Sequence, residues 1–435
     1  LSTERVDEGI HYTLTDAEGK GNLCMEKHAF VKACLKILDT PQLTEDMVAN
    51  RAARLIYSGK LISYQGNVYR SKTAYAESNL AELLSRQMRS ARSHSYGDLE
   101  ADLDAEELRL KLKLAPEQRE AVKMALTQGL SVITGGPGTG KSMILRAILD
   151  IYRRYNPRKE ICLCAPTGRA ARRMEQSTGL EASTIHKALG LMAGEDGDYG
   201  EPVALEADII LVDEVSMMDI YLAGRLLEAV KSNAQIVLIG DSDQLPSVGP
   251  GAVLSEMIAS ARIPVVRLDR VFRQTDGSRI AVNAKLICHG NLSLEYGSDF
   301  RFVDSANLSD SANRIAELYM QEVAKYGVDN VALLSPYRQK TETGVNALNE
   351  LLREMVNPPE AGKQEVTCGK RKFRTGDKVM QIKTLKVKEG DTVVILEDAG
   401  NGWYKVDYDT VEGYMSGEYL TVSAKSDVTI GYGLV

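Results

Sequence analysis

The sequence predicts an α/β protein built around a parallel β-sheet. Three short apolar runs support this: LSVIT at 130–134, IILV at 209–212 and QIVLIG at 235–240. Continuous apolar runs are typical of parallel strands that are buried on both faces. Helical patterns separate these runs, as in MILRAILDIY from Met143 onward. Strands that alternate with helices indicate a parallel sheet covered by helices.

The stretch GGPGTGKS follows the first of these runs and precedes a helical pattern. Its glycines allow a tight turn whose N–H groups face a phosphate chain, and the helix N-terminus adds positive potential. The Lys141 ammonium can reach the β- and γ-phosphates, and the Ser142 hydroxyl can bind Mg²⁺. The sequence therefore predicts a nucleoside triphosphate site formed by Gly135, Gly136, Pro137, Gly138, Thr139, Gly140, Lys141 and Ser142.

Polar side chains at the ends of two other expected strands complete this site. Asp213 and Glu214 follow the IILV run, so Asp213 is expected to hold Mg²⁺ and Glu214 to activate the attacking water. Gln244 follows the QIVLIG run and is expected to sense the γ-phosphate. Arg273, in VVRLDRVFRQ, is expected to neutralise transition-state charge from a neighbouring lobe.

A second group of residues follows the apolar run ICLCAP. The stretch TGRAARRM opens a helix with three arginines, where carboxylates are usually preferred. This pattern indicates either a phosphate-facing surface or a solvated helix face. His186, in STIHKAL, is more often a structural group than a ligand at such a position.

The chain divides into five expected parts. The first has the order helix, helix, hairpin, which resembles a winged helix. Such a unit fits either nucleic-acid contact or a scaffold role, and we favour the scaffold role. The fourth is expected to contain short strands at 301–304 and 331–339. The last alternates strands with Gly and Asn turns. The expected order is a winged-helix-like unit (1–90), a polar linker (91–110), a first α/β lobe (111–265), a partial second lobe (266–382) and a small β-barrel (383–435).

Composition narrows the protein class. The net charge of −7 argues against a generally basic nucleic-acid binder, although a local basic groove remains compatible with it. No apolar run has transmembrane length, and six cysteines without a CxxC pair fit a reduced, cytoplasmic protein without a metal centre. The chain begins with Leu1, so we expect it to be cut from a longer parent.

Taken together, these stretches resemble the RecD-like DNA helicases of superfamily 1. GGPGTGKS, APTGRAARRM with STIH, LVDEVSMMD, GDSDQLPSVGPG and RLDRVFRQ occur in the family's order. The resemblance implies two RecA-like lobes with ATP and Mg²⁺ between them, and 5′-to-3′ movement on single-stranded DNA or on DNA with a 5′ overhang. It also implies that Gln118 reads the adenine. Lys141, Glu214, Gln244 and Arg273 would be catalytic, and the DNA strand would contact Pro166, Thr167, Arg169, Thr184 and His186.

The family pattern stops after Ile382, and residues 386–424 resemble a bacterial SH3-type domain. The expectation is a monomeric helicase or translocase acting in DNA repair or recombination, with a truncated second lobe. Two alternatives stay open: a catalytically impaired ATP-binding protein that binds DNA or a partner, and another kind of P-loop ATPase.

Overall fold

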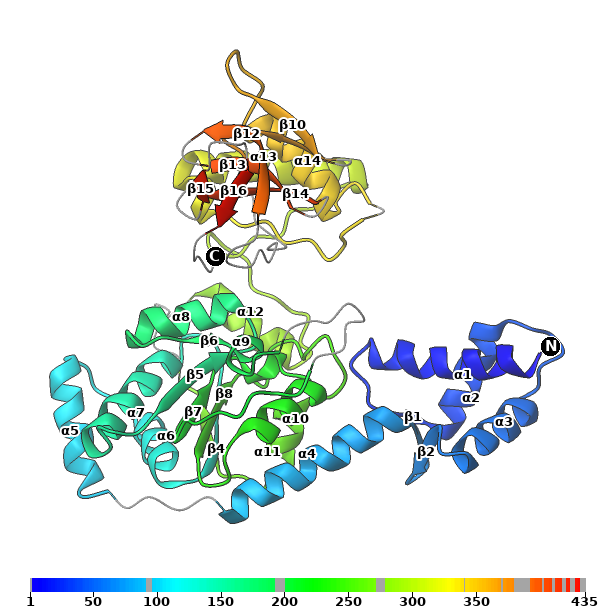
Figure 1. The fold of residues 1–435 in the computed structure, drawn as a ribbon, viewed down its shortest axis with the longest axis vertical. Helices are drawn as coiled ribbons and strands as arrows, with labels where there is room; N and C mark the ends of the chain where they lie inside the picture. Colours follow the sequence, from blue (N-terminus) through cyan, green and yellow to red (C-terminus); the bar gives the residue numbers. More distant parts are fainter. Residues whose placement is uncertain are drawn as a thin grey trace. The chain divides into compact units, whose positions relative to one another are not determined.

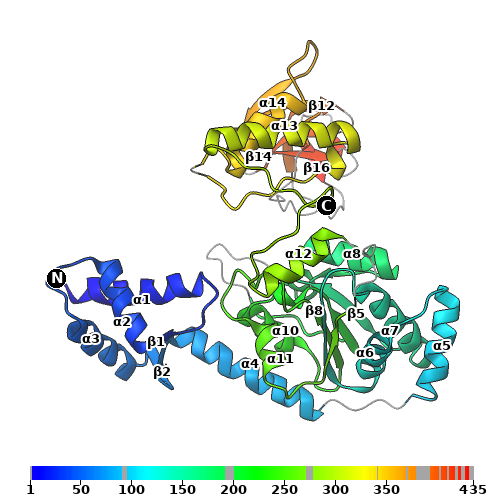
Figure 2. The same ribbon diagram turned by 180° about the vertical axis from the view of Figure 1, so that it is seen from behind.

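The structure, a computed structural model, forms two compact units, residues 1–301 and 302–435. Both units are drawn in Figure 1 and, from behind, in Figure 2. The structure describes residues 2–435 with the exception of 91–95, 192–199, 271–277, 340, 369–370, 379–391, 401–402, 409–410, 417–419, 423–426 and 431–435.

The first unit begins with three helices and a small antiparallel sheet (Figure 1). The sheet has the order β1-β3-β2, and Gln65-Gly66 forms the turn between β2 and β3. The core between these helices and the sheet is filled by Ile10, Phe30, Cys34, Val48 and Leu61. The expected hairpin is therefore present. The elements are α1 (Thr3–Glu18), β1 (Met25–Glu26), α2 (Lys27–Leu38), α3 (Glu45–Tyr57), β2 (Leu61–Tyr64) and β3 (Asn67–Arg70).

Two helices join this region to the parallel sheet. Helix α4 (Ser71–Ser90) packs against α10 (Ile220–Ala229). Residues Leu99–Leu110 form helix α5, whereas a polar linker was expected there. Asp98 caps α5 by accepting hydrogen bonds from the Glu100 and Ala101 amides, and Leu103 is fully buried. A helix rather than a linker forms because the apolar face that contains Leu103 packs into a hydrophobic core.

The centre of the first unit is a six-stranded sheet of order β6-β5-β7-β8-β4-β9, and each neighbouring pair is parallel. This confirms the predicted α/β class. Helices cover both faces of the sheet (Figures 1 and 2). Its elements run α6 (Pro116–Thr127), β4 (Leu130–Gly135), α7 (Lys141–Tyr155), β5 (Ile161–Ala165), α8 (Gly168–Thr178), β6 (Ser183–Thr184), α9 (Ile185–Ala188), β7 (Ile209–Val212), η1 (Val215–Met217), α10, β8 (Gln235–Gly240), α11 (Val253–Ala259), β9 (Val265–Leu268) and α12 (Arg279–Cys288).

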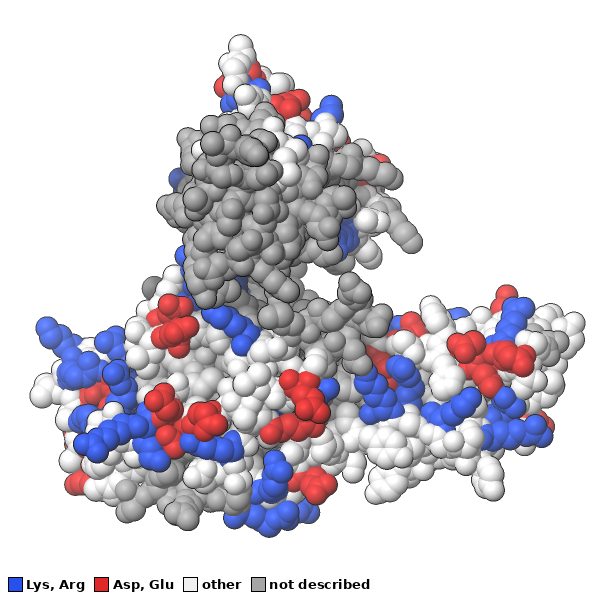
Figure 3. Space-filling model, in the orientation of Figure 1, with Lys and Arg blue, Asp and Glu red and all other residues white. Residues whose placement is uncertain are grey.

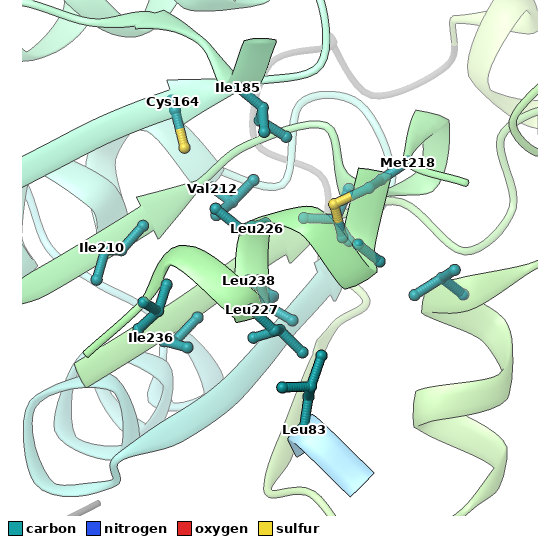
Figure 4. Packing of buried hydrophobic residues seen from close by; sticks show 14 of the residues in the cluster. Leu83, Cys164, Ile185, Ile210, Val212, Met218, Leu226, Leu227, Ile236 and Leu238 are labelled. Carbon is teal, nitrogen blue, oxygen red and sulfur yellow. The ribbon is translucent and has the colours of Figure 1, made fainter. Parts of the chain in front are cut away.

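Alternate residues of the strands supply two hydrophobic cores. Ile210, Val212, Ile236 and Leu238 pack with α10 and with Leu83 of α4, as Figure 4 shows. The strand residues that alternate with these face the other core, which they share with α6 and α7. They are Ile133, Leu163, Ile209, Leu211, Val237 and Ile239. Burial on both faces explains why these strands read as unbroken apolar runs.

Strand β9 extends this sheet, because Val265–Leu268 pairs with Val132–Gly135 of β4. The first unit therefore continues past the expected lobe boundary at 265/266, and it ends at Arg301.

The described part of the second unit contains two α-helices, a short 3₁₀ helix and two antiparallel sheets. The order β14-β13-β12-β16-β15 describes the larger sheet, and β10 pairs with β11. The elements are α13 (Leu308–Tyr326), η2 (Val328–Asn330), α14 (Val345–Val356), β10 (Glu365–Cys368), β11 (Arg371–Arg374), β12 (Thr392–Gly400), β13 (Trp403–Tyr408), β14 (Val411–Ser416), β15 (Leu420–Val422) and β16 (Asp427–Ile430).

Two expected strands of this region are not present. Residues 301–304 and 331–339 are irregular, and the prediction of strands there was wrong. Leu334, expected to be buried, is 91% exposed, and Phe302 is also exposed. A strand needs a hydrogen-bonded neighbour, and in the described part of this unit neither segment is paired in a sheet.

Among the described residues, no helix combines the length and the apolar character needed to cross a membrane.

Candidate nucleotide and nucleic-acid site

The loop between β4 and α7 has the shape that phosphate binding requires. Gly138 and Gly140 have φ values of 80° and 88°, a left-handed region that favours glycine. At Gly135, an added Cβ would lie 2.7 Å from the Leu268 Cβ and 2.8 Å from the Leu268 carbonyl oxygen. Because the second contact is with backbone, β9 leaves room only for glycine at this position.

The Lys141 ammonium lies back over this loop at the start of α7. It donates to the carbonyl oxygens of Gly135 at 2.5 Å and Gly136 at 3.2 Å. Thr139 closes the turn by donating from Oγ1 to the Gly136 carbonyl at 2.8 Å. Ser142 follows Lys141 in the first turn of α7. The ammonium is thus held where a phosphate group could replace these carbonyls as its partner.

Gln118 supports the loop from α6. Its side-chain amide donates to the Thr139 carbonyl at 2.8 Å and accepts from the Ala115 N–H at 2.9 Å. The side chain is buried, and it contacts Gly140 so closely that a Cβ there would clash. Gln118 therefore fixes the phosphate loop in this structure, a contact that sequence reasoning missed. Adenine recognition by Gln118 stays a prediction.

Asp213 and Glu214 emerge from the carboxyl end of β7 beside the loop. The Glu214 N–H donates to the Asp213 carboxylate at 2.9 Å, and the Asp213 N–H donates to the Cys164 carbonyl at 3.1 Å. Burial raises the pKa of Asp213, although the positive charges of Lys141 and Arg173 oppose this rise. The loop lysine therefore lies close enough to Asp213 for its charge to stabilise the carboxylate.

Glu214 has an unusual conformation for a residue with a side chain. Its φ of 54° is left-handed, and its Oε2 atom is buried without a hydrogen-bond partner among the described residues. Burial and the neighbouring Asp213 charge raise the pKa of Glu214. Backbone strain and an unsatisfied buried oxygen are costly, and they often mark functional positions.

Gln244 lies one strand further along the same sheet edge. Its amide donates to the Asp241 carboxylate at 3.1 Å, and Asp241 is buried at the end of β8. Strands β7 and β8 are parallel neighbours, so their carboxyl ends lie side by side, and the Asp241 charge contributes to the raised pKa of Glu214. Lys141, Asp213, Glu214 and Gln244 therefore converge on one edge. Arg273 lies outside the described residues.

Arg173 of α8 is a charged neighbour that the predicted site did not include. Its charge lowers the pKa of both Asp213 and Glu214. The run of three arginines in this helix indicated positive charge near the site, but it did not indicate which of the three lies close enough to act on the carboxylates.

Mg²⁺ fits this group of residues. The half-buried Asp213 carboxylate and the Ser142 hydroxyl are hard oxygen donors of the kind that Mg²⁺ prefers, directly or through water. Within the described ranges, no cluster of three or more His, Cys, Asp or Glu side chains could hold a metal alone.

The residues expected to contact DNA lie beside this site, at the ends of β5 and β6. The two strands are parallel neighbours, with Ala165 opposite Thr184. Pro166 and Thr167 follow β5, and Thr167 caps α8 by accepting from the Ala170 N–H at 3.2 Å.

Thr184 likewise caps α9, where it accepts from the Lys187 N–H at 3.1 Å, and His186 is half-buried in that helix. Arg169 is exposed on the first turn of α8. The fold thus brings Pro166, Thr167, Arg169, Thr184 and His186 to one edge, with both threonine hydroxyls engaged in helix caps.

Comparison with known proteins assigns two regions. Residues 113–306 match the family described as AAA domain, and residues 384–421 match the bacterial SH3 domain. The ATP-dependent RecD2 DNA helicase of Deinococcus radiodurans is 32% identical over 387 residues, which cover 88% of this chain and 49% of that protein.

The RecBCD enzyme subunit RecD of Mycolicibacterium smegmatis is 40% identical over 165 residues, covering 33% of this chain and 30% of that protein. The chain thus spans about half the length of the first of these relatives and less of the second. The crystal structure of the Pif1 helicase from Candida albicans aligns with a TM-score of 0.36 and 19% identity, over 68% of this chain and 69% of that chain.

Proposed function

We propose that this chain, a RecD-like protein of superfamily 1, hydrolyses ATP and couples the hydrolysis to movement along single-stranded DNA. The observation that carries the proposal is the convergence of Lys141, Asp213, Glu214 and Gln244 on one edge of a parallel sheet. Ligands of open α/β sheets bind at such an edge. The similarity to two RecD proteins supports the same activity.

Each residue of this edge has a chemical task in the proposed reaction. The loop amides and Lys141 bind the triphosphate, and Lys141 neutralises charge that develops on it. Ser142 and Asp213 would hold Mg²⁺, which supplies further charge neutralisation when it is bound. The raised pKa and unpartnered oxygen of Glu214 suit a group that accepts a proton from the attacking water.

Gln244 would report the state of the γ-phosphate to the rest of the protein. Its loop is connected to the N-terminal region, because the Gly251 N–H donates to the Gly21 carbonyl at 3.0 Å. The Pro250 carbonyl accepts from the Ile220 N–H at 3.0 Å, which links the same loop to α10. A change at Gln244 could therefore reach elements that lie outside the nucleotide site.

The proposed substrate is single-stranded DNA or DNA with a 5′ overhang, bound by Pro166, Thr167, Arg169, Thr184 and His186. Arg173 and, from the neighbouring lobe, Arg273 would add positive charge at the nucleotide. Gln118 would read the adenine while holding the loop. We further propose a monomeric, cytoplasmic protein that moves 5′ to 3′ in DNA repair or recombination.

The test is ATP hydrolysis by the purified chain with and without single-stranded DNA. We expect DNA to stimulate turnover and Lys141→Ala to reduce it by about 10²-fold or more, because charge stabilisation of the transition state is lost. Unchanged nucleotide affinity and turnover in Lys141→Ala would refute the proposal. ATP binding without DNA-stimulated turnover would refute the motor function and indicate an impaired nucleotide-binding protein.

A further inference from the structure

The C-terminal end of α3 carries an unusual surface. Tyr57 is the last residue of this helix, and its side chain is 96% exposed, more than any other large apolar side chain in the described part of the chain. Burying an aromatic ring is normally favourable, so a ring left this open in solvent forgoes that free energy.

Two cationic residues lie three positions to either side of Tyr57 in the sequence. Arg54 lies three residues before Tyr57, and residues at this spacing are neighbours on a helix surface. The chain then turns sharply at Gly59, whose φ is 74°, and the Lys60 N–H donates to the Leu55 carbonyl at 2.9 Å. This bond folds Lys60 back onto the last turn. We call Arg54, Tyr57 and Lys60 the α3 tip.

The cations of the α3 tip are available for a ligand. Among the described residues, neither Arg54 nor Lys60 forms an ion pair, whereas Arg51 of the same helix donates to the Asp7 carboxylate. The Lys60 charge acts on that carboxylate only at longer range, where it helps to lower the pKa of Asp7. In Figure 3, Lys and Arg side chains are interspersed with Asp and Glu side chains over this N-terminal region.

A scaffold explains only part of this helix. Val48, Ala52 and Leu55 pack into the core of the N-terminal region, as a scaffold requires. Cations near a helix C-terminus also stabilise its dipole, which accounts for Arg54 and Lys60 in part. Neither effect accounts for a fully exposed aromatic ring between them.

Charge selects the kind of nucleic acid. The first turn of α3 carries Glu45 and Asp46, whose carboxylates would repel phosphates if the helix entered a duplex groove by its N-terminal half. The cations lie at the other end, beside the ring. An exposed ring between two cations suits an unpaired base that stacks while its neighbouring phosphates pair with the cations.

We propose that the α3 tip binds single-stranded nucleic acid, with Tyr57 stacking on an unpaired base and Arg54 and Lys60 holding adjacent phosphates. This contact is separate from the edge of the parallel sheet that is proposed to bind DNA, and it does not require ATP.

Photo-crosslinking of the full chain to an iododeoxyuridine-substituted oligonucleotide, without nucleotide, tests the contact directly. We expect a crosslinked peptide that contains Tyr57. Binding of the same oligonucleotide should weaken about 5- to 150-fold in Tyr57→Ala, which is the range for loss of one stacked base. Tyr57→Phe keeps the ring and should bind as the wild type does.

The paired variant Arg54→Ala/Lys60→Ala should reduce the slope of log affinity against log salt by about 1.4, because each phosphate contact on a single strand contributes about 0.7. Tyr75→Ala is the matched control, since Tyr75 is 66% exposed on α4 and lacks this arrangement. DNA-independent ATP turnover should be unchanged in all of these variants.

The contact is overturned if Tyr57→Ala binds the oligonucleotide as Tyr75→Ala does, or if only duplex binding weakens. Its failure is distinguishable from failure of the proposed motor. A Tyr57 crosslink that persists in Arg169→Ala while DNA stimulation of ATPase is absent supports the α3 tip and counts against the motor. DNA-stimulated turnover without a Tyr57 crosslink has the opposite meaning.

Discussion

Glu214 shows how a single residue can be placed at a cost to the fold. It combines a left-handed backbone with a buried oxygen that has no partner among the described residues, and its carboxyl pKa is raised by burial and by Asp213. A raised carboxyl pKa means that the folded protein disfavours the ionised form. This cost is absent below the ordinary value of 4.5 and grows as pH rises above it.

The change Glu214→Gln removes this ionisation while keeping the shape of the side chain. We expect a higher Tm than the wild type at about pH 8, with the difference shrinking as pH falls towards 4.5, because only the wild type must ionise a buried group. Turnover should fall by about 10²- to 10⁴-fold, the usual contribution of general base catalysis. Melting curves from pH 4 to 8 measure the first effect. A Tm difference that is constant across this range would contradict it.

At the scale of elements, predictions that depended on contiguous sequence were correct, whereas one that depended on a tertiary partner was wrong. The loop from Gly135 to Ser142 could be predicted, because its glycines, lysine and flanking strand and helix are contiguous in sequence. The strand expected at 331–339 has the same apolar pattern as β7, but the described part of the second unit offers it no paired neighbour. Sequence patterns report burial tendency, and they do not report whether a partner strand is present.

The residues of the candidate site also fall into those that sequence and topology predict and those that depend on packing. Lys141, Asp213 and Gln244 each end or follow a strand, so parallel topology brings them together. The contact of Gln118 with Thr139 depends on how α6 packs against the loop, and no local pattern encodes that packing.

Helix α5 provides a test of packing at this scale, because its sequence suggested a linker. Leu103 is fully buried with α6 and α7 residues, whereas Leu108 on the same helix is 82% exposed. Leu103→Ala should destabilise the first unit by about 2–5 kcal/mol, and Leu108→Ala by less than about 0.5 kcal/mol. Urea unfolding followed by circular dichroism measures both. Equal stabilities would mean that α5 is only a tether.

The whole molecule consists of two compact units, and the nucleotide site belongs to the first of them. Lys141, Asp213, Glu214 and Gln244 all precede Arg301, and each has its contacts within residues 1–301. A ligand that binds only one of two independently folding units stabilises that unit alone. The response of thermal unfolding to nucleotide therefore reports how the chain is divided.

Calorimetry of the full chain should show two transitions, of which Mg²⁺ with a non-hydrolysable ATP analogue raises only one. At a ligand concentration of about 100 times Kd the stabilisation is roughly 2.7 kcal/mol. For a unit of this size, that raises Tm by roughly 4 °C. In Lys141→Ala the same transition should no longer respond, because the ammonium that meets the phosphates is gone. A single transition that moves as a whole with nucleotide would show that residues 302–435 unfold together with residues 1–301, and the division into two units would then be wrong.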